Sequence, residues 1–332
     1  MKEIVVSGIR ATGKLHLGNY LGAMRNFVGL QGQYDCFFFV ADYHSLTTET
    51  NPGQLKTHLT EIVKDYLAIG LDPEKCTIFV QSSVPEVAEL SLLLSMVEPA
   101  ADLEMCPTYK EKKQAQAENV NSGLLFYPIL MAADILIQRA TLVPVGKDQL
   151  PHIQITRDIA ERFNARYGEV FPIPQALESR PVRVPGLDGT EKMGKSSHNT
   201  IDLVDTPETI SRKLAVAVTD TARKRRQDPG NPFKCNIFAI HELVSPEKTI
   251  SEIKDQCRSA GIGCVECKRL LASKIIELLS PFQEKRKEIE AKPDFVREVL
   301  CEGAACARET ARQTVEEARE KMGLRHFQGG IK

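Results

Sequence analysis

The sequence predicts an α/β protein with a doubly wound, Rossmann-like parallel sheet and a second, all-helical domain. In the first half of the 332 residues, short β-branched or aromatic runs alternate with longer stretches whose apolar residues recur at helical spacing. After about residue 197 the strand-like runs stop and amphipathic stretches follow one another. With 42% hydrophobic and 26% charged residues, the chain has enough apolar material for one large domain and a smaller one.

Each expected strand of the first domain is a short apolar run close to Gly, Gln or Asp. These runs are EIVVSGI (3–9), CFFFVAD (36–42), CTIFVQ (76–81) and TLVPVG (141–146). Between and after them we expect helices at 18–30, 52–71, 84–97, 124–138 and 148–168. The 52–71 stretch has Pro near its start and Gly near its end, as helix termini favour. In such a sheet, ligands bind beyond the carboxyl ends of the strands, where the strand order reverses.

The second half is expected to be helical throughout. Apolar residues at helical spacing predict helices at 206–218, 248–257, 267–291 and 307–323. The segment 219–235 between the first two is basic and then rich in Pro and Gly, which is typical of a loop. We therefore expect domains at 1–197 and 198–305, with a C-terminal helical segment at 306–332.

The net charge, the N-terminal sequence and the spacing of the cysteines limit the classes of function that the protein can have. The net charge is −1, so nucleic-acid binding would have to use local basic patches. The N-terminus lacks a signal-peptide pattern and no apolar run reaches membrane-spanning length, which predicts a soluble, cytoplasmic protein. Nine unevenly spread cysteines do not resemble a secreted disulfide framework, and Cys36, Cys76 and Cys106 are expected to be reduced core thiols.

The loop after the first strand, SGIRATGKLHLGNYLG, fits neither the dinucleotide fingerprint nor the phosphate loop. His16, Gly18 and Asn19 lie where the first helix is expected to begin. A helix N-terminus offers free N–H groups and a positive dipole end to phosphate. Gly18 would let a nucleotide approach the backbone, while His16 and Asn19 could donate to phosphate oxygens. A purely structural role for the histidine is the alternative.

A second phosphate-binding candidate lies about 175 residues downstream, in DGTEKMGKSSHNT. Lys192, Lys195 and Ser196 lie there on a polar stretch, and two cations and a hydroxyl suit a pentavalent phosphate better than a ground-state one. A solvated charged loop is the alternative interpretation.

Together, HLGN and KMGKS resemble the two signature motifs of class I aminoacyl-tRNA synthetases, with Asn19 and Gly194 in place of the usual histidine and serine. FFFVADYHSLT, YPILMAADILI and LVPVGKDQLPHIQITRDIAERFN, in this order, resemble the tryptophanyl members of that class over nearly the whole chain. The resemblance implies that L-tryptophan is activated with ATP and Mg²⁺ to tryptophanyl-adenylate and transferred to the 3′ end of tRNA(Trp). It also implies a homodimer, an anticodon-binding role for 198–305, and a C-terminal segment that folds back on the catalytic domain.

The resemblance assigns the site residues. The ATP-binding set would be Arg10, Ala11, Thr12, Gly18, Asn19, Gly146, Lys147, Asp148, Val184, Lys192, Met193, Gly194, Lys195 and Ser196. Of these, Asn19, Lys192, Lys195 and Ser196, together with His16, would be catalytic. The tryptophan-binding set would be His44, Tyr127, Met131, Asp134 and Gln149.

Asp134 is the expected determinant of amino-acid specificity. In MAADIL, Met131 and Asp134 are three residues apart and therefore share one helix face. A carboxylate among apolar residues is costly unless it finds a donor, here the indole N–H. A pocket built in this way rejects side chains that lack the donor. The alternative is that Asp134 caps a helix or pairs with a lysine.

Four cysteines in the second half are spaced C-x21-C-x6-C-x2-C: Cys235, Cys257, Cys264 and Cys267. Such thiolates can hold tetrahedral zinc or a cubane cluster. The spacing resembles that of bacterial tryptophanyl-tRNA synthetases with a [4Fe–4S] cluster near the anticodon-recognising region, one residue shorter in the first interval. A cluster, zinc and unligated thiols are the three alternatives.

Three rival functions follow from the same motifs. Tyrosyl-tRNA synthetase shares the fold and would require tyrosine instead. A small-molecule adenylyltransferase also carries a His-x-Gly motif, but the basic helical second half argues against it. A synthetase-like RNA-binding module without catalysis is disfavoured by the intact KMGKS and GKDQ segments.

Overall fold

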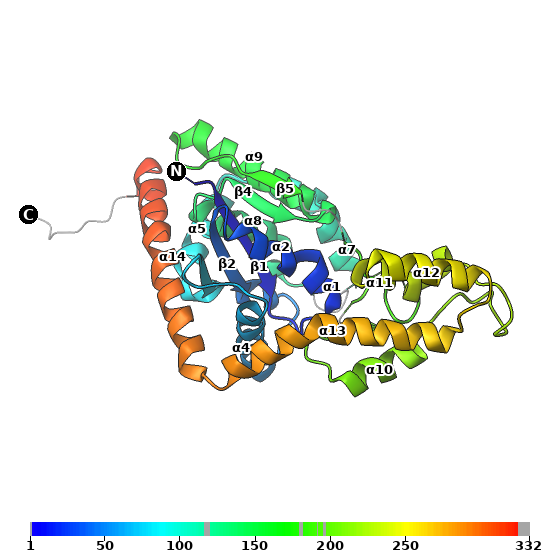
Figure 1. Cartoon of the computed structure of the whole chain (residues 1–332). Helices are drawn as coiled ribbons and strands as arrows, with labels where there is room; N and C mark the ends of the chain where they lie inside the picture. Colours follow the sequence, from blue (N-terminus) through cyan, green and yellow to red (C-terminus); the bar gives the residue numbers. More distant parts are fainter. Residues whose placement is uncertain (1, 116–119, 179–181, 191, 195–196, 325–332) are drawn as a thin grey trace, which may run out of the picture.

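The protein consists of a helix-covered sheet with a helical lobe at one end, as the computed structural model shows (Figure 1). The structure describes residues 2–115, 120–178, 182–190, 192–194 and 197–324. Within these ranges, no helix combines the length and apolarity that crossing a bilayer needs.

The sheet has five parallel strands in the order β3-β2-β1-β4-β5. Its strands are β1 (Ile4–Arg10), β2 (Asp35–Ala41), β3 (Cys76–Val80), β4 (Leu142–Val145) and β5 (Gln175–Glu178). The doubly wound parallel sheet predicted from the sequence is therefore confirmed. The strand order reverses between β1 and β4, which is where a ligand is expected. The β5 strand was not predicted, because QALE consists largely of helix-favouring residues.

Helices cover both faces of this sheet. They are α1 (Leu17–Asn19), α2 (Arg25–Leu30), α3 (Asp42–Ser45), α4 (Pro52–Ala68), α5 (Glu86–Ser95), α6 (Ala100–Met105), α7 (Pro107–Ala115), α8 (Ser122–Ile137) and α9 (Leu150–Tyr167). The expected helix at 18–30 is instead a short α-turn, a π-helical turn at 20–24 and α2. Successive strand residues alternate between two cores, so Val5 and Phe38 belong to one and Val6 and Phe39 to the other.

The second part is helical, as predicted. It comprises α10 (Pro207–Val216), α11 (Asn236–Val244), α12 (Glu247–Arg258), α13 (Cys264–Glu290) and α14 (Pro293–Lys321). The α11 helix was not predicted separately. The lobe consists of α10, α11, α12 and the end of α13 that packs against α10 and α11 (Figure 1). The other end of α13 packs against α4, so this helix connects the lobe to the sheet part.

The α14 helix begins at Pro293, well before the expected start at 307, and lies against β3, α5 and α8. The amide Nε2 of Gln138 donates to the carbonyl of Ala307 at 3.1 Å. Arg308 on α14 donates to both carboxylate oxygens of Glu86 at the start of α5. The last long helix is therefore packed onto the sheet part rather than onto the lobe.

Candidate functional site

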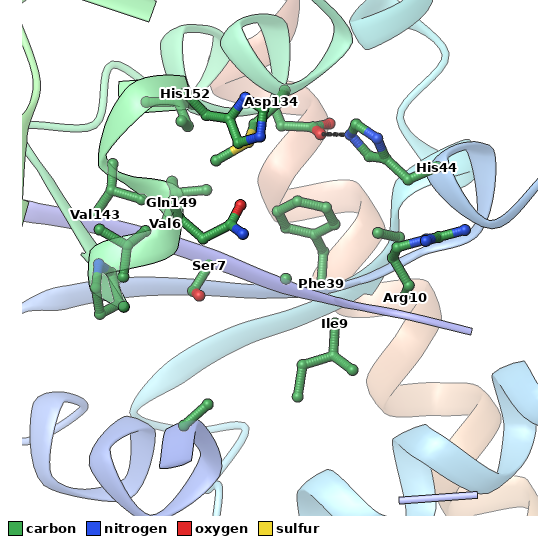
Figure 2. Close-up of a pocket in the computed structure, with 18 of the residues that line it drawn as sticks. Val6, Ser7, Ile9, Arg10, Phe39, His44, Asp134, Val143, Gln149 and His152 are labelled. Carbon is green, nitrogen blue, oxygen red and sulfur yellow. Dashed lines mark hydrogen bonds and ion pairs between the residues drawn. The ribbon is translucent and has the colours of Figure 1, made fainter. Parts of the chain in front are cut away.

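A cavity of about 480 Å³ lies at the reversal point between β1 and β4. Its wall comes from the carboxyl halves of these two strands and from α3, α8 and the start of α9 (Figure 2). Among its lining residues are Arg10, His44, Tyr127, Met131, Asp134, Gly146 and Gln149. The structure therefore brings together all five residues that were expected to bind tryptophan and two of those that were expected to bind ATP, Arg10 and Gly146.

Asp134 on α8 is buried at 5% exposure and faces His44 on α3. Nε2 of His44 lies 2.9 Å from Oδ2 of Asp134 (Figure 2). The amide Nε2 of Gln81 donates to both carboxylate oxygens of Asp134, at 2.7 and 2.9 Å. Burial raises the pKa of Asp134, and the hydrogen bonds from His44 and Gln81 oppose that rise. The interpretation of Asp134 as a lysine partner is not supported, because its neighbours are an imidazole and an amide.

A second polar pair lies beside this carboxylate. The hydroxyl of Tyr127 is 3.2 Å from Nε2 of His152, and the two rings meet at 69°. His152 on α9 is 2% exposed and lines the same cavity. Neither Gln81 nor His152 was predicted. His152 lies three residues after Gln149, so helical spacing could have indicated it.

The end of β1 forms the opposite side of the cavity. Arg10 donates to the hydroxyls of Thr47 and Thr48, at 3.1 and 2.5 Å. Its Nε is buried and has no partner among the described residues, while burial lowers the pKa of the guanidinium. The N–H of Ala11 donates to Oγ of Ser45 at 2.8 Å, which fixes the chain where β1 ends. A half-buried guanidinium with a buried, unused N–H donor suits an anionic ligand.

His16 caps the helix that follows. Its Nδ1 accepts the N–H of Gly18 at 3.1 Å, and Oδ1 of Asn19 accepts the N–H of His16 at 3.1 Å. The N–H of Leu17 donates to the carbonyl of Ile201, and that of Asn19 to the carbonyl of His16. The expectation of free N–H groups at this helix start was therefore wrong, because the cap and a neighbouring segment already use them.

The two signature motifs lie side by side. A Cβ placed on Gly18 would lie 3.7 Å from Cβ of Met193. Met193 is buried at 1% exposure, and its N–H donates to the carbonyl of Val184. Lys192 is exposed, and the N–H of Gly194 donates to Oδ1 of Asn199 at 2.8 Å. Lys195 and Ser196 lie outside the described residues.

Four thiols line a small cavity in the lobe: Cys235, Cys257, Cys264 and Cys267. Nη1 of Arg223 approaches Sγ of Cys264 at 3.9 Å, while Nε of Arg223 is buried without a partner in the described part of the chain. A Cβ on Gly230 would lie 2.6 Å from Sγ of Cys257, so this glycine makes room for the thiol. Burial raises the pKa of Cys267 to about 12. Among described side chains, no three His, Cys, Asp or Glu lie close enough to hold a single metal ion.

An exposed aromatic ring lies beside these thiols. Phe233 is 66% exposed, and two cations from α12 lie near its ring. Lys254 Nζ lies 5.4 Å and Arg258 Cζ 5.3 Å from the ring centroid. An exposed ring among cations is a suitable surface for an unstacked nucleic-acid base and its phosphates.

Comparisons with known proteins agree on one family. Residues 2–280 match the model of class I tRNA synthetases (W and Y). The chain is 46% identical to a tryptophan–tRNA ligase of Deinococcus radiodurans, over 96% of this chain and 98% of that protein. It is 45% identical to that of Thermotoga maritima, over 96% and 99%. The crystal structure of Campylobacter jejuni tryptophanyl-tRNA synthetase with ADP and tryptophan is similar at a TM-score of 0.88 and 36% identity, over 97% of this chain and all of that one.

Proposed function

The chain belongs to the tryptophanyl-tRNA synthetases of class I, and from that membership we propose how its residues act. Its activity is that of a tryptophan–tRNA ligase, which activates L-tryptophan with ATP and transfers it to tRNA(Trp). One observation carries the proposal for the site. Asp134 lies buried in a cavity at the reversal point of the sheet, and its carboxylate is held by two donors.

In the activation step the tryptophan carboxylate attacks the α-phosphorus of ATP and pyrophosphate leaves, so no side-chain nucleophile is needed. We assign Asp134 to the indole N–H and Tyr127 and Gln149 to the α-ammonium, while Met131 and His44 line the ring pocket. These residues hold the attacking oxygen close to phosphorus, which converts a bimolecular step into an effectively unimolecular one.

We assign nucleotide binding to both signature motifs and to the ends of β1 and β4. Arg10, with its unused buried donor, would contact a phosphate oxygen. The remaining groups are His16, Asn19, Lys192, Lys195 and Ser196 at the phosphates, Ala11, Thr12, Gly18, Met193 and Gly194 along the nucleotide, Gly146, Lys147 and Asp148 by the ribose, and Val184 by the adenine. Mg²⁺ would arrive on the ATP phosphates and neutralise charge there.

The site assignment is tested by ATP–pyrophosphate exchange. The wild type should exchange label with tryptophan but not with tyrosine, and tyrosine-dependent exchange would support the rival. Asp134→Asn should raise KM for tryptophan with little change in KM for ATP, because only the amino-acid side loses its charged acceptor. Wild-type kinetics in this variant would remove Asp134 from the site.

We propose that residues 198–305 form a domain that binds the tRNA anticodon, with Phe233 stacking on a loop base. Three features support this: the exposed ring, its two cationic neighbours and the adjacent basic segment Arg223–Arg226. Phe233→Ala should raise KM for tRNA in aminoacylation and leave tryptophan-dependent exchange unchanged. Phe295→Ala, at an exposed ring on α14, is the matched control. Equal effects of the two variants would contradict the assignment.

We further propose that the four cysteines hold a [4Fe–4S] cluster as a structural staple for this surface. The donor set fits, since four thiols face one cavity beside a cationic side chain. Tetrahedral zinc would need the sulfurs about 3.8 Å apart, from Zn–S bonds of about 2.3 Å. No trio of potential ligands that close occurs among the described residues, which disfavours a preformed zinc site. The cavity now holds about 20 Å³, so the thiols would have to move outward.

Iron and acid-labile sulfide in anaerobically purified protein test the cluster. About four of each per chain, with a broad absorption band near 400 nm, is the expected result. Stoichiometric zinc without colour would favour the zinc alternative, and protein without metal would favour free thiols. If Cys264→Ser left aminoacylation and stability unchanged, the staple role would be wrong.

We propose a homodimer formed through the face that carries α5, α6 and α8. Four large apolar side chains on these neighbouring helices, or directly after α5, are exposed: Leu92, Met96, Met105 and Phe126. Light scattering should give twice the chain mass, and Met96→Lys should shift it towards the monomer.

Since ribosomes use the charged tRNA, we place the enzyme in the cytoplasm.

A further inference from the structure

Gln81 is fully buried behind the carboxylate of Asp134. It begins the 3₁₀ turn Gln81–Ser83 directly after β3 and has 0% exposure. Its Nε2 donates to Oδ1 of Asp134 at 2.7 Å and to Oδ2 at 2.9 Å. Its Oε1 accepts the backbone N–H of His44 at 3.4 Å. The amide of Gln81 therefore links the end of β3 to His44 on α3 and to Asp134 on α8, both of which line the amino-acid pocket.

The three hydrogen bonds to the Asp134 carboxylate are shared unequally between its two oxygens. Oδ2 accepts from both Gln81 and His44, whereas Oδ1 accepts from Gln81 alone among the described residues. An ionised carboxylate has about four acceptor sites. Oδ1 therefore keeps the larger unused capacity, and it can accept a further N–H without losing a contact that the protein already makes.

We propose that Gln81 is a positioning residue for amino-acid selection: it fixes the rotation of the Asp134 carboxylate so that Oδ1 is presented to the indole N–H. Gln81 does not line the cavity, so it acts through Asp134 and touches no substrate atom. This inference rests on the proposed role of Asp134 and adds the group that sets its geometry.

The amide is chemically suited to this task. It donates to Asp134 with one end and accepts from His44 with the other, and a buried carboxylate needs such donors to offset its lost hydration. A methionine of similar length would fill the space but donate nothing. Asp134 would then keep only His44 as a donor and could rotate about its side-chain bond.

The test compares tryptophan with 3-(3-benzothienyl)alanine, in which sulfur replaces the indole N–H, in ATP–pyrophosphate exchange. Gln81→Met should lower kcat/KM for tryptophan roughly 10- to 100-fold, the range for a hydrogen bond to a charged group. The loss should come through KM for tryptophan, with KM for ATP unchanged. The analogue cannot use Oδ1, so its kcat/KM should change much less and the discrimination ratio should fall. Ser83→Ala, at an exposed position of the same turn, is the matched control.

The outcomes separate the possible failures. If Gln81→Met leaves the discrimination ratio at the wild-type value, the proposal is overturned, whether exchange is unchanged or falls equally for both amino acids. An equal fall would mean that Gln81 only supports the fold, and thermal unfolding would show it. If the wild type itself does not prefer tryptophan over the analogue, the assignment of Asp134 fails, and the role of Gln81 fails with it.

Discussion

Gly303→Ala should separate α14 from the sheet. Gly303 lies inside α14 where the helix crosses β3, and a Cβ built there would lie 1.9 Å from the carbonyl oxygen of Ile78. It would also lie 2.8 Å from the carbonyl carbon of Ile78. The obstacle is the backbone of the edge strand β3, so no side-chain rotation can relieve the clash. The helix, the strand or both must shift.

The size of the effect follows from these distances. A carbon–oxygen contact normally settles near 3.3 Å, so the two backbones must separate by about 1.4 Å. Overpacking of this kind costs about 1–3 kcal/mol, and the better helix propensity of Ala returns about 1 kcal/mol at most. We expect a net destabilisation of about 1–2 kcal/mol, measured from the midpoint of urea unfolding at unchanged slope.

The same substitution at a glycine with free space around it should change the free energy of unfolding in the opposite direction. Gly29 is an exposed residue of α2 whose added Cβ would meet nothing within 4 Å. Gly29→Ala should stabilise the protein by about 0.4–1 kcal/mol, because it restricts only the unfolded chain. If Gly303→Ala proved as stable as Gly29→Ala, the close packing of α14 on β3 would be refuted. Ile78 lies three residues before Gln81, so Gly303→Ala should also raise KM for tryptophan.

Three further outcomes follow from the same contacts. Arg286→Met removes the ion pair with buried Asp65 and the neighbouring pair with Glu61, and should destabilise the protein by about 3 kcal/mol in urea unfolding, whereas a loss below about 1 kcal/mol would show that water already screens these pairs. In a pH–rate profile, kcat/KM for tryptophan should fall as the pH decreases through the raised pKa of Asp134, since the protonated carboxyl is a weaker acceptor. The fall should begin above the usual aspartate range, about 3.9, and a flat profile down to that range would contradict it. Gly18→Ala would put a methyl group 2.9 Å from Cε1 of His16 and should raise KM for ATP but not for tryptophan, as exchange at varied substrate would show.

The sequence predicts the elements whose pattern is intrinsic to them. CFFFV and IVVSG are strands because β-branched and aromatic residues favour an extended, buried backbone. The strand β5 has no such pattern: Gln175, Ala176 and Leu177 are extended because β4 offers an edge to pair with. A segment whose secondary structure depends on its neighbours in space cannot be predicted from its own sequence pattern.

The residues of the candidate site likewise divide into those that a local pattern predicts and those that only the fold brings together. Met131 and Asp134 could be predicted as neighbours because helical spacing alone puts them on one face. Gln81 contacts Asp134 across 53 positions, a separation that only the sheet order closes. Its position did carry a signal: it is a polar residue immediately after a buried strand, at the carboxyl edge where ligands bind. What the sequence could not supply was the direction in which its amide points.

The meeting of the two signature motifs has a backbone cause that also concerns the lobe. The N–H of Leu17 donates to the carbonyl of Ile201 at 2.8 Å, and the N–H of Leu203 donates to the carbonyl of Leu15 at 3.0 Å. These two bonds hold the HLGN loop against the segment between KMGKS and α10, whose first residue is Pro207. The chain that follows KMGKS is therefore attached to the residues on either side of His16 only a few positions before it enters the helical part. Because backbone hydrogen bonds at this spacing form a short antiparallel pair, centred on the bridge between His16 and Asp202, separating the histidine from this segment would break both bonds.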